Sequence, residues 1–321
     1  MTLNLRPGGC NALGKTSGKP ARREGRLVAR GVRVAFISIA AATAQLVLAG
    51  YVASAVDLAL RAAGQPQLLE TALASLKPGR RGVTDLYFVG FAADSGQDVF
   101  MKEVQTIRTL FDERFDTLGR SVALVNNSKT LDQLPVATMV NLGAVLRRIG
   151  KVMNVEEDIL FLYLTSHGST AKGLSVRMWP LEPCELDGAG LRALLDEAHI
   201  KWRVIVVSAC FSGSFIAPLR SDTTLVATAA AANRMSFGCE CGNDFTYFGR
   251  AYFHEALRDT HSFLAAFDRA RAAVLRREEA ERRRSSCPQL FVGGAMRAKL
   301  KQLERQLALG RHGMAVSGSK Q

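Results

Sequence analysis

The sequence lacks the features of three common kinds of site. Its one close pair of cysteines, Cys239 and Cys241, has a single residue between its members, whereas zinc ligands of this kind are usually separated by two or more. The Gly-x-Ser-x-Gly motif of a serine nucleophile is absent. No basic stretch is interleaved with aromatic residues as in proteins that bind single-stranded nucleic acids. These absences disfavour a metal site, a serine hydrolase and a nucleic-acid partner.

The net charge of +13 is concentrated at the two ends of the chain. Residues 1–33 carry eight basic residues and one acidic residue, and residues 269–321 carry thirteen basic and four acidic residues. The rest of the chain has 21 basic and 24 acidic side chains, so its central part is nearly neutral. The basic composition therefore does not indicate a nucleic-acid-binding domain.

Charge is also absent from residues 34–56, a run of 23 residues that is long enough to cross a bilayer as a helix. Five arginines between positions 22 and 33 precede the run, and Ala53, Ser54 and Ala55 lie near its end. This layout fits a secretory signal peptide cleaved after Ala55, and it fits an uncleaved transmembrane signal anchor equally well. In both cases the positive-inside rule predicts that the arginines stay in the cytoplasm and that the following domain crosses the membrane.

We therefore expect an anchored protein on the periplasmic side of the inner membrane, or a secreted or periplasmic protein after signal cleavage. A hydrophobic helix docked on a cytoplasmic domain is less favoured, because nothing upstream of residue 34 could cover it. In an exported domain, one or two disulfide bridges could form, and the sequence does not choose their pairing. The cysteines concerned are Cys184, Cys239, Cys241 and Cys287.

The chain divides into five predicted parts. Residues 1–33 form a basic leader that lacks apolar periodicity and is expected to be disordered. The apolar segment 34–56 is followed by a linker at 57–83, which contains one short helix at 68–76. Strands alternate with helices over residues 84–300, which predicts an α/β domain with a mainly parallel sheet of about six strands. Residues 301–321 form the end of a basic helix and a tail.

The individual elements follow from apolar runs and helical periodicity. We predict strands at 85–90, 121–126, 159–164, 204–207, 224–229 and 289–292, with a short hairpin or edge strand at 173–179. We predict helices at 97–115, 138–152, 187–199, 245–258, 262–283 and 296–309.

Two of the predicted strands end in a reactive side chain. The apolar run 159–164 leads to His167 and Gly168, and the run 204–207 leads to Cys210. Ligands of open α/β sheets bind outside the carboxyl ends of the strands, so these side chains can face each other there. A histidine can activate a cysteine thiol as a nucleophile, and the backbone amides of Gly168 and Cys210 can form an oxyanion hole.

A purely structural role is the alternative for each of these side chains. A single buried cysteine is usually a small apolar residue, and a single histidine is usually a core residue with its hydrogen bonds satisfied. Here the two residue types lie at the ends of two strands, and each is followed by glycine within three residues. This shared placement favours catalysis over a structural role.

These motifs resemble those of the legumain family of cysteine peptidases. The resemblance rests on Ser-His-Gly at 166–168 and on Ser-Ala-Cys-Phe-Ser-Gly-Ser at 208–214, and it extends over roughly residues 85–297. The wider group includes the caspases, the gingipain-type enzymes and the peptidase subunit of the GPI transamidase. The resemblance implies a bacterial-type member with a caspase-like three-layer sandwich. It also implies a cysteine endopeptidase that uses Cys210 and His167, acts on a peptide or protein substrate and needs no cofactor.

The predicted substrate pocket departs from the family. Legumains have an arginine in the loop after the first strand and a glutamate after the catalytic cysteine, whereas here residues 93–97 contain no arginine and Phe211 follows Cys210. A preference for asparagine is therefore not expected. By analogy with the family, further pocket candidates are Ser214, Ala229, Ala230, Asn233 and Asp244. Asp244 could select a basic side chain, and it could equally cap the helix that begins at 245.

Asp94 lies in the loop after the first strand and is the candidate for orienting His167, as the third member of a catalytic triad does. Capping of the following helix by Asp94 or Asp98 is the favoured alternative. Two other functions stay open. The same acyl-enzyme could react with an amine, which would make the protein a transamidase or transpeptidase. The fold could also serve as a peptide-binding module without catalysis.

Overall fold

The computed structural model describes residues 63–171, 173–179, 181–240 and 242–317. The chain divides into two compact units, Met1–Gly64 and Gln65–Gln321, and almost all described residues belong to the second. The predicted leader at 1–33 and the predicted anchor or signal at 34–56 lie outside the described residues. Within the part of the chain that the structure describes, no helix is both long enough and apolar enough to span a membrane.

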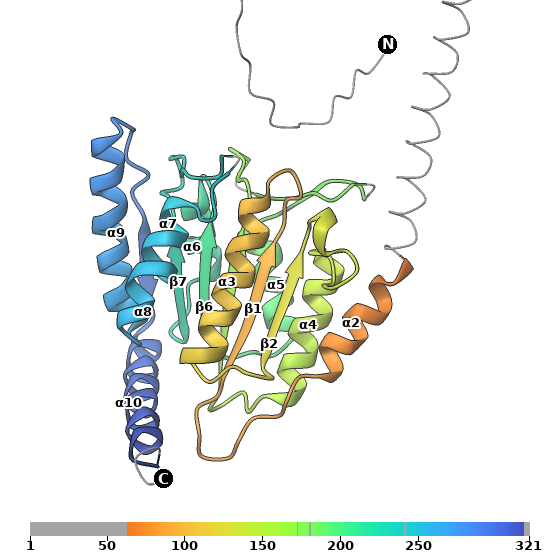
Figure 1. Ribbon diagram of the computed structural model, residues 1–321, viewed down its shortest axis with the longest axis vertical. Helices are drawn as coiled ribbons and strands as arrows, with labels where there is room; N and C mark the ends of the chain where they lie inside the picture. Colours follow the sequence, from red (N-terminus) through yellow and green to blue (C-terminus); the bar gives the residue numbers. More distant parts are fainter. Residues whose placement is uncertain (1–62, 172, 180, 241, 318–321) are drawn as a thin grey trace, which may run out of the picture. The chain divides into compact units, whose positions relative to one another are not determined.

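A six-stranded sheet forms the centre of the second unit, in the order β2-β1-β3-β6-β7-β8 (Figure 1). The first five strands in this order are parallel, and β8 runs antiparallel to β7. The strands are β1 (Leu86–Ala92), β2 (Ser121–Val125), β3 (Ile159–Thr165), β6 (Trp202–Ser208), β7 (Thr224–Thr228) and β8 (Gln289–Val292). The six predicted core strands and their mainly parallel arrangement are thus confirmed.

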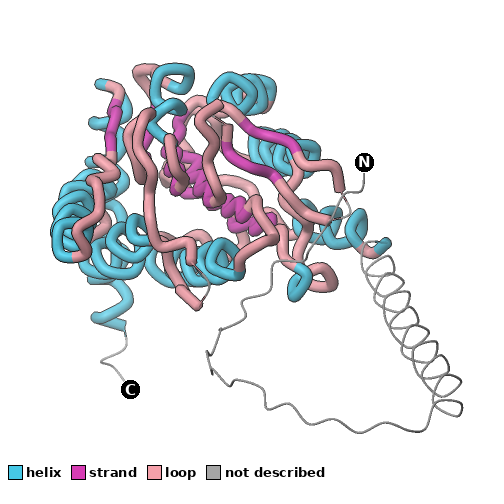
Figure 2. Tube along the Cα trace, turned by 90° about the horizontal axis from the view of Figure 1, so that it is seen from above, coloured by secondary structure: helices cyan, strands magenta, loops and turns pink. Residues whose placement is uncertain are grey.

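Helices cover both faces of the sheet, so the domain is the predicted three-layer α/β sandwich (Figure 2). One face packs against α3 (Asp98–Arg114), α9 (Phe263–Ala280) and the first part of α10 (Gly294–Ser317). The other face packs against α4 (Met139–Val152) and α5 (Gly188–Glu197).

Successive residues of one strand contribute to opposite layers of the core. Phe161 and Tyr163 of β3 pack with the α3 layer, whereas Leu160 and Leu162 pack with the α4 layer. All seven residues of β3 are buried. This double coverage explains why the strand is a continuous apolar run rather than an alternating pattern.

The predicted linker is structured from Gln65 onward. Helix α2 (Gln65–Ala74) begins three residues before its predicted start. The Gln65 side-chain amide donates to the carbonyls of Leu131 and Leu134, and its oxygen accepts from the Val136 amide at 2.7 Å. Leu76 is buried in the core. These contacts place the boundary of the domain at Gly64 rather than at residue 84.

Two local features differ from the sequence prediction. The predicted helix at 245–258 consists of α7 (Tyr247–Gly249), a π-helical stretch at Arg250–Ala256 and α8 (Leu257–Asp259). The segment 173–179, predicted as a short hairpin or edge strand, contains β4 (Leu174–Val176), which forms a separate antiparallel two-stranded sheet with β5 (Cys184–Leu186). The remaining short elements are 3₁₀ turns at Ser128–Thr130 and Ser212–Phe215 and the helix α6 (Ile216–Leu219).

Candidate active site

The register of β3 and β6 brings His167 and Cys210 together. These strands are parallel neighbours, and their last paired residues are Thr165 and Ser208. The Ser166 amide continues this pairing by donating to the Ser208 carbonyl at 3.3 Å. His167 and Cys210 each follow two residues after the last pair. They therefore leave the same edge of the sheet side by side, as the sequence predicts.

Gly168 lies directly against the main chain of Cys210. A Cβ atom at position 168 would be 1.9 Å from the Cys210 carbonyl oxygen and 3.2 Å from its amide nitrogen. No real Cβ approaches another atom so closely, so only glycine fits here without a backbone shift. The two predicted oxyanion-hole amides thus belong to neighbouring backbone segments.

The imidazole and backbone of His167 are held by two different elements. The ring forms a T-shaped pair with Phe100 on α3, with ring centroids 5.2 Å apart and an interplanar angle of 88°. The His167 carbonyl accepts a hydrogen bond from the Ser175 amide of β4 at 2.9 Å. His167 as a whole residue is half-buried.

The sulfur of Cys210 has a hydrogen-bonding partner that sequence reasoning missed. The Ser236 amide donates to Sγ at 3.3 Å, and the Ser236 hydroxyl donates at 3.7 Å. The thiol itself donates to the Ser236 carbonyl at 3.5 Å. In the thiolate state the two donations to sulfur remain and stabilise the anion. Ser236 lies in the loop after β7, and its place beyond another parallel strand is the signal that could have identified it.

The Asp94 carboxylate is held by groups other than the imidazole of His167. The buried carboxylate accepts from the Gly96 amide at 2.8 Å, from the Arg177 guanidinium at 3.0 Å and from the Ser175 hydroxyl at 3.2 Å. Among the described residues, none of its hydrogen bonds runs to His167. The hydrogen bonds link Asp94 to His167 through Ser175, whose amide donates to the His167 carbonyl.

The alternative role as a helix cap is wrong for both aspartates near α3. The N-cap of α3 is Gln97, which makes no capping hydrogen bond with its side chain. Asp98 is the first residue of the helix, and its carboxylate accepts from Asn127 and Lys129, which lowers its pKa.

The predicted pocket residues occupy different environments. Phe211 adopts a left-handed backbone conformation with φ of 59°, and its amide donates to the Arg234 carbonyl at 2.7 Å. The Ser214 hydroxyl donates to the Phe211 carbonyl at 2.9 Å. Ala230 is fully buried, and its amide donates to the Ser212 hydroxyl. The neighbouring Ala229 is buried as well, whereas Asn233 is exposed.

Asp244 forms an exposed ion pair with Lys102 of α3 at 2.9 Å, and this lysine lowers the pKa of the Asp244 carboxyl. The capping role considered for Asp244 is wrong. The residue that caps α7 is Thr246, whose hydroxyl accepts from the Gly249 amide.

The described cysteines are free thiols. Cys184 and Cys287 are exposed, and Cys239 is half-buried. Burial raises the pKa of the Cys239 thiol, and the nearby Cys210 raises it further. The disulfide bridges considered among Cys184, Cys239 and Cys287 are thus not formed in the structure, whereas Cys10 and Cys241 lie outside the described residues.

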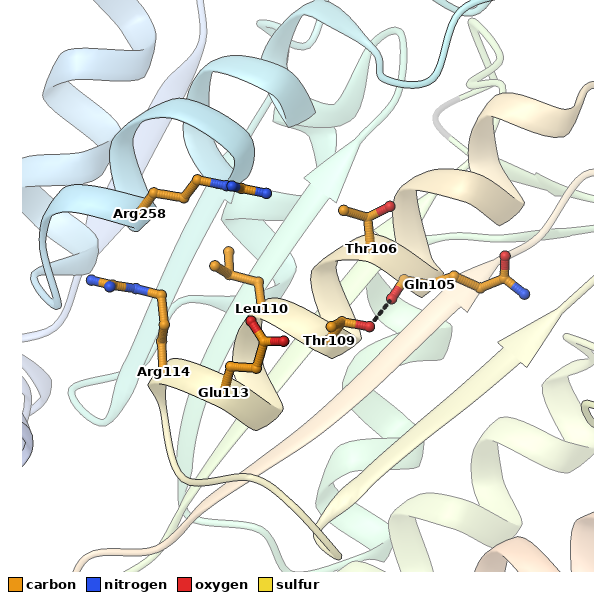
Figure 3. Close-up of a pocket in the computed structure, with 7 residues that line it drawn as sticks. All are labelled: Gln105, Thr106, Thr109, Leu110, Glu113, Arg114 and Arg258. Atoms are coloured by element: carbon orange, nitrogen blue, oxygen red, sulfur yellow. Dashed lines mark hydrogen bonds between the residues drawn. The ribbon is translucent and has the colours of Figure 1, made fainter. Parts of the chain in front are cut away.

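A cavity of about 540 Å³ lies elsewhere, between α3 and α8 (Figure 3). Its lining includes Thr109 and Arg114 from the second half of α3 and Arg258 from α8. The α3 residue that contacts His167 is Phe100, near the start of the helix. The residues that line the cavity include no cysteine or histidine, so it offers no thiol nucleophile with an imidazole base.

Comparison with known proteins supports the same region. Residues 141–298 match the sequence model of the Peptidase C13 family, and this segment contains both His167 and Cys210. No curated protein matches the chain.

Proposed function

Since residues 141–298 make this chain a member of the peptidase C13 family of legumain-like cysteine peptidases, we propose that it is an endopeptidase with Cys210 as nucleophile and His167 as base. The observation that carries the proposal is the junction of the two motifs. His167 and Cys210 follow paired strand ends, and Gly168 touches the Cys210 backbone. A substrate carbonyl at this junction would meet the nucleophile, the base and two backbone amides together.

The proposed reaction begins when His167 takes the proton from the Cys210 thiol. The sulfur attacks the scissile carbonyl carbon, and the carbonyl oxygen becomes an oxyanion that accepts from the Gly168 and Cys210 amides. Collapse of this intermediate breaks the C–N bond, and His167 gives its proton to the leaving amine. Water, deprotonated by His167, then attacks the thioester, releases the carboxylic acid and restores the thiol.

We also propose that the domain acts on peptides or proteins after export, either anchored through residues 34–56 or released from them. Support comes from the uncharged 23-residue run and the arginines before it. A fusion of residues 1–62 to a reporter that is active only outside the cytoplasm would test export. An inactive reporter would contradict it.

The enzymatic proposal is tested by incubating the full chain with an unbiased peptide mixture and identifying the cut sites by mass spectrometry. Wild type, Cys210→Ala and His167→Ala should be run in parallel. Cleavage by the wild type alone would support the proposal and reveal the residue preference at the cut site. Cleavage that persists in Cys210→Ala would contradict it. An added amine nucleophile distinguishes hydrolysis from transfer, because transfer would yield amide products.

A further inference from the structure

A carboxylate is buried beneath the active site, on the sheet-facing side of α3. Glu103 has no exposed surface. One of its oxygens, Oε2, accepts from the Tyr163 hydroxyl at 2.6 Å and from the Thr165 hydroxyl at 2.9 Å. The other oxygen, Oε1, accepts from the amide and the hydroxyl of Thr246 at 3.0 and 2.8 Å. Four donors thus converge on one side chain, and none of them comes from its own helix.

These donors belong to segments that carry the site. Thr165 is the last residue of β3, two positions before His167. Thr246 ends the loop that contains Ser236, the partner of the Cys210 sulfur, and it caps α7. Glu103 therefore ties the base-bearing strand to the end of the loop that contacts the nucleophile.

The same network reaches β6. The Ser208 and Thr246 hydroxyl oxygens are 3.0 Å apart. Because the single hydrogen of the Thr246 hydroxyl is donated in a hydrogen bond to Glu103, this hydroxyl can only accept a hydrogen bond from Ser208. Ser208 is the last residue of β6 and lies two positions before Cys210. One chain of hydrogen bonds thus joins the ends of the two strands that lead to His167 and Cys210.

The arrangement is built for an ionised carboxylate. A carboxylate only accepts hydrogen bonds, and all four groups around Glu103 can donate. Burial raises the pKa of Glu103, and its hydrogen bonds to Tyr163, Thr246 and Thr165 oppose that rise. The chain also makes room for the carboxylate, because a Cβ at Gly249 would lie only 1.7 Å from Oε1.

We infer that Glu103 is a positioning residue for the reaction at Cys210, because it fixes the ends of β3 and β6 and the Ser236 loop relative to one another. The inference rests on the proposed peptidase function. Glu103 touches neither the nucleophile nor the base, and it acts through Thr165, Thr246 and Ser208. A small misplacement of reacting groups is enough to slow an enzyme strongly.

The chain offers a matched control at the other end of β3. Asp158 is also fully buried, and its carboxylate accepts from the Asp85 and Asn154 amides at 2.9 and 2.7 Å. Burial raises its pKa as well. Asp158 directly precedes the first residue of β3, whereas Glu103 contacts Tyr163 and Thr165 at the other end of the strand. Glu103→Gln and Asp158→Asn therefore replace the same kind of buried carboxyl group, near the active site and away from it.

The test compares the full-length wild type with the variants E103Q and D158N. For each protein we would measure kcat, KM and the melting temperature. We would also measure the rate at which iodoacetamide alkylates Cys210, by peptide mapping. We expect both variants to have a lower melting temperature than the wild type. Only E103Q should lower kcat, by about tenfold or more with KM unchanged, and slow alkylation of Cys210. Equal kcat and alkylation rates in E103Q and wild type, or equal losses in both variants, would overturn the inference.

If E103Q does not fold, a second variant tests the role of Glu103. Thr165→Val removes one donor to Glu103 and keeps the shape of the side chain, and it should lower kcat and the alkylation rate in the same direction. Unchanged rates in T165V would overturn the inference. The alkylation rate separates the two proposals, because it needs no substrate. A wild type that cleaves no peptide refutes the peptidase function, whereas alkylation that is insensitive to these substitutions refutes the role of Glu103.

Discussion

The main chains of Gly168 and Cys210 are in contact just beyond the ends of two neighbouring strands. They lie so close that a Cβ atom at position 168 would clash with the Cys210 carbonyl. The contact joins the histidine motif to the cysteine motif through backbone atoms. The position of the proposed nucleophile relative to the base therefore depends on a residue without a side chain. This dependence leads to the first prediction.

Gly168→Ala should abolish most activity, because a Cβ there must displace the Cys210 carbonyl. We expect a loss of about 100-fold in kcat and a destabilisation of about 1–3 kcal/mol from overpacking. Peptide cleavage and urea denaturation measure the two effects. Gly143→Ala on α4 is the control, since its Cβ would meet only side-chain atoms of Arg147 and Leu194 at 3.2 and 3.3 Å. Full activity in Gly168→Ala would show that the contact is dispensable.

Ser236→Ala should slow alkylation of Cys210 by a few-fold, because the thiolate loses the hydroxyl donor and keeps the amide donor. Peptide mapping after brief iodoacetamide treatment gives the rate for each cysteine. The matched control is Ser285→Ala, whose hydroxyl contacts the Cys287 amide and sulfur. That control should leave the Cys210 rate unchanged. Faster alkylation of Cys210 in Ser236→Ala would mean that the hydroxyl shields the sulfur and does not stabilise the anion.

Asp94→Asn should reduce kcat by about tenfold or less, far less than His167→Ala, because Asp94 reaches the histidine only through Ser175. Steady-state kinetics of the two variants make the comparison. Ser175→Ala removes the hydroxyl that links Asp94 to Ser175 and keeps the backbone amide that holds His167, so it should lower kcat by about as much as Asp94→Asn. A loss in Asp94→Asn as large as that in His167→Ala would indicate direct contact with the imidazole during catalysis.

Glu281 should contribute to acid sensitivity. Hydrogen bonds from Tyr247, Arg277 and Arg283 lower its pKa from 4.5 to about 2. Because the folded pKa is depressed, this contribution to stability is present above pH 4.5 and is lost as the pH falls from 4.5 towards 2. Urea midpoints of wild type and Glu281→Gln should therefore differ at neutral pH and converge at pH 2, with a smaller difference at high salt. A constant difference across this range would contradict the prediction.

The strands and the two principal site residues were predictable because their signals are local. A buried parallel strand is a continuous apolar run, and His167 and Cys210 are reactive residues just after two such runs. The apolar runs also predicted β8, although no local pattern of residues indicates its antiparallel direction. The assignment of His167 and Cys210 as catalytic stays a prediction until their variants are measured.

The supporting residues could not be predicted, because their roles depend on contacts between distant segments. Glu103 looks like a solvent-facing residue between Lys102 and Val104, and only the folded chain surrounds it with donors from β3 and from the residue that caps α7. Likewise, nothing near Asp94 in the sequence shows that Ser175 and Arg177 will donate hydrogen bonds to its carboxylate. The π-helical stretch also lacks a local signal in the sequence.

The reversed direction of β8 decides where the chain goes after the sheet. Gln289 pairs with Thr228 at the end of β7, and Val292 pairs with Leu225 near its start, so β8 leads away from the edge that carries Cys210. The Met296 amide in the first turn of α10 donates to the carbonyl of Asp222, just before β7. Helix α10 therefore departs from the opposite side of the domain (Figure 1). Immobilising the protein through the end of α10 would leave the edge with His167 and Cys210 facing the solution.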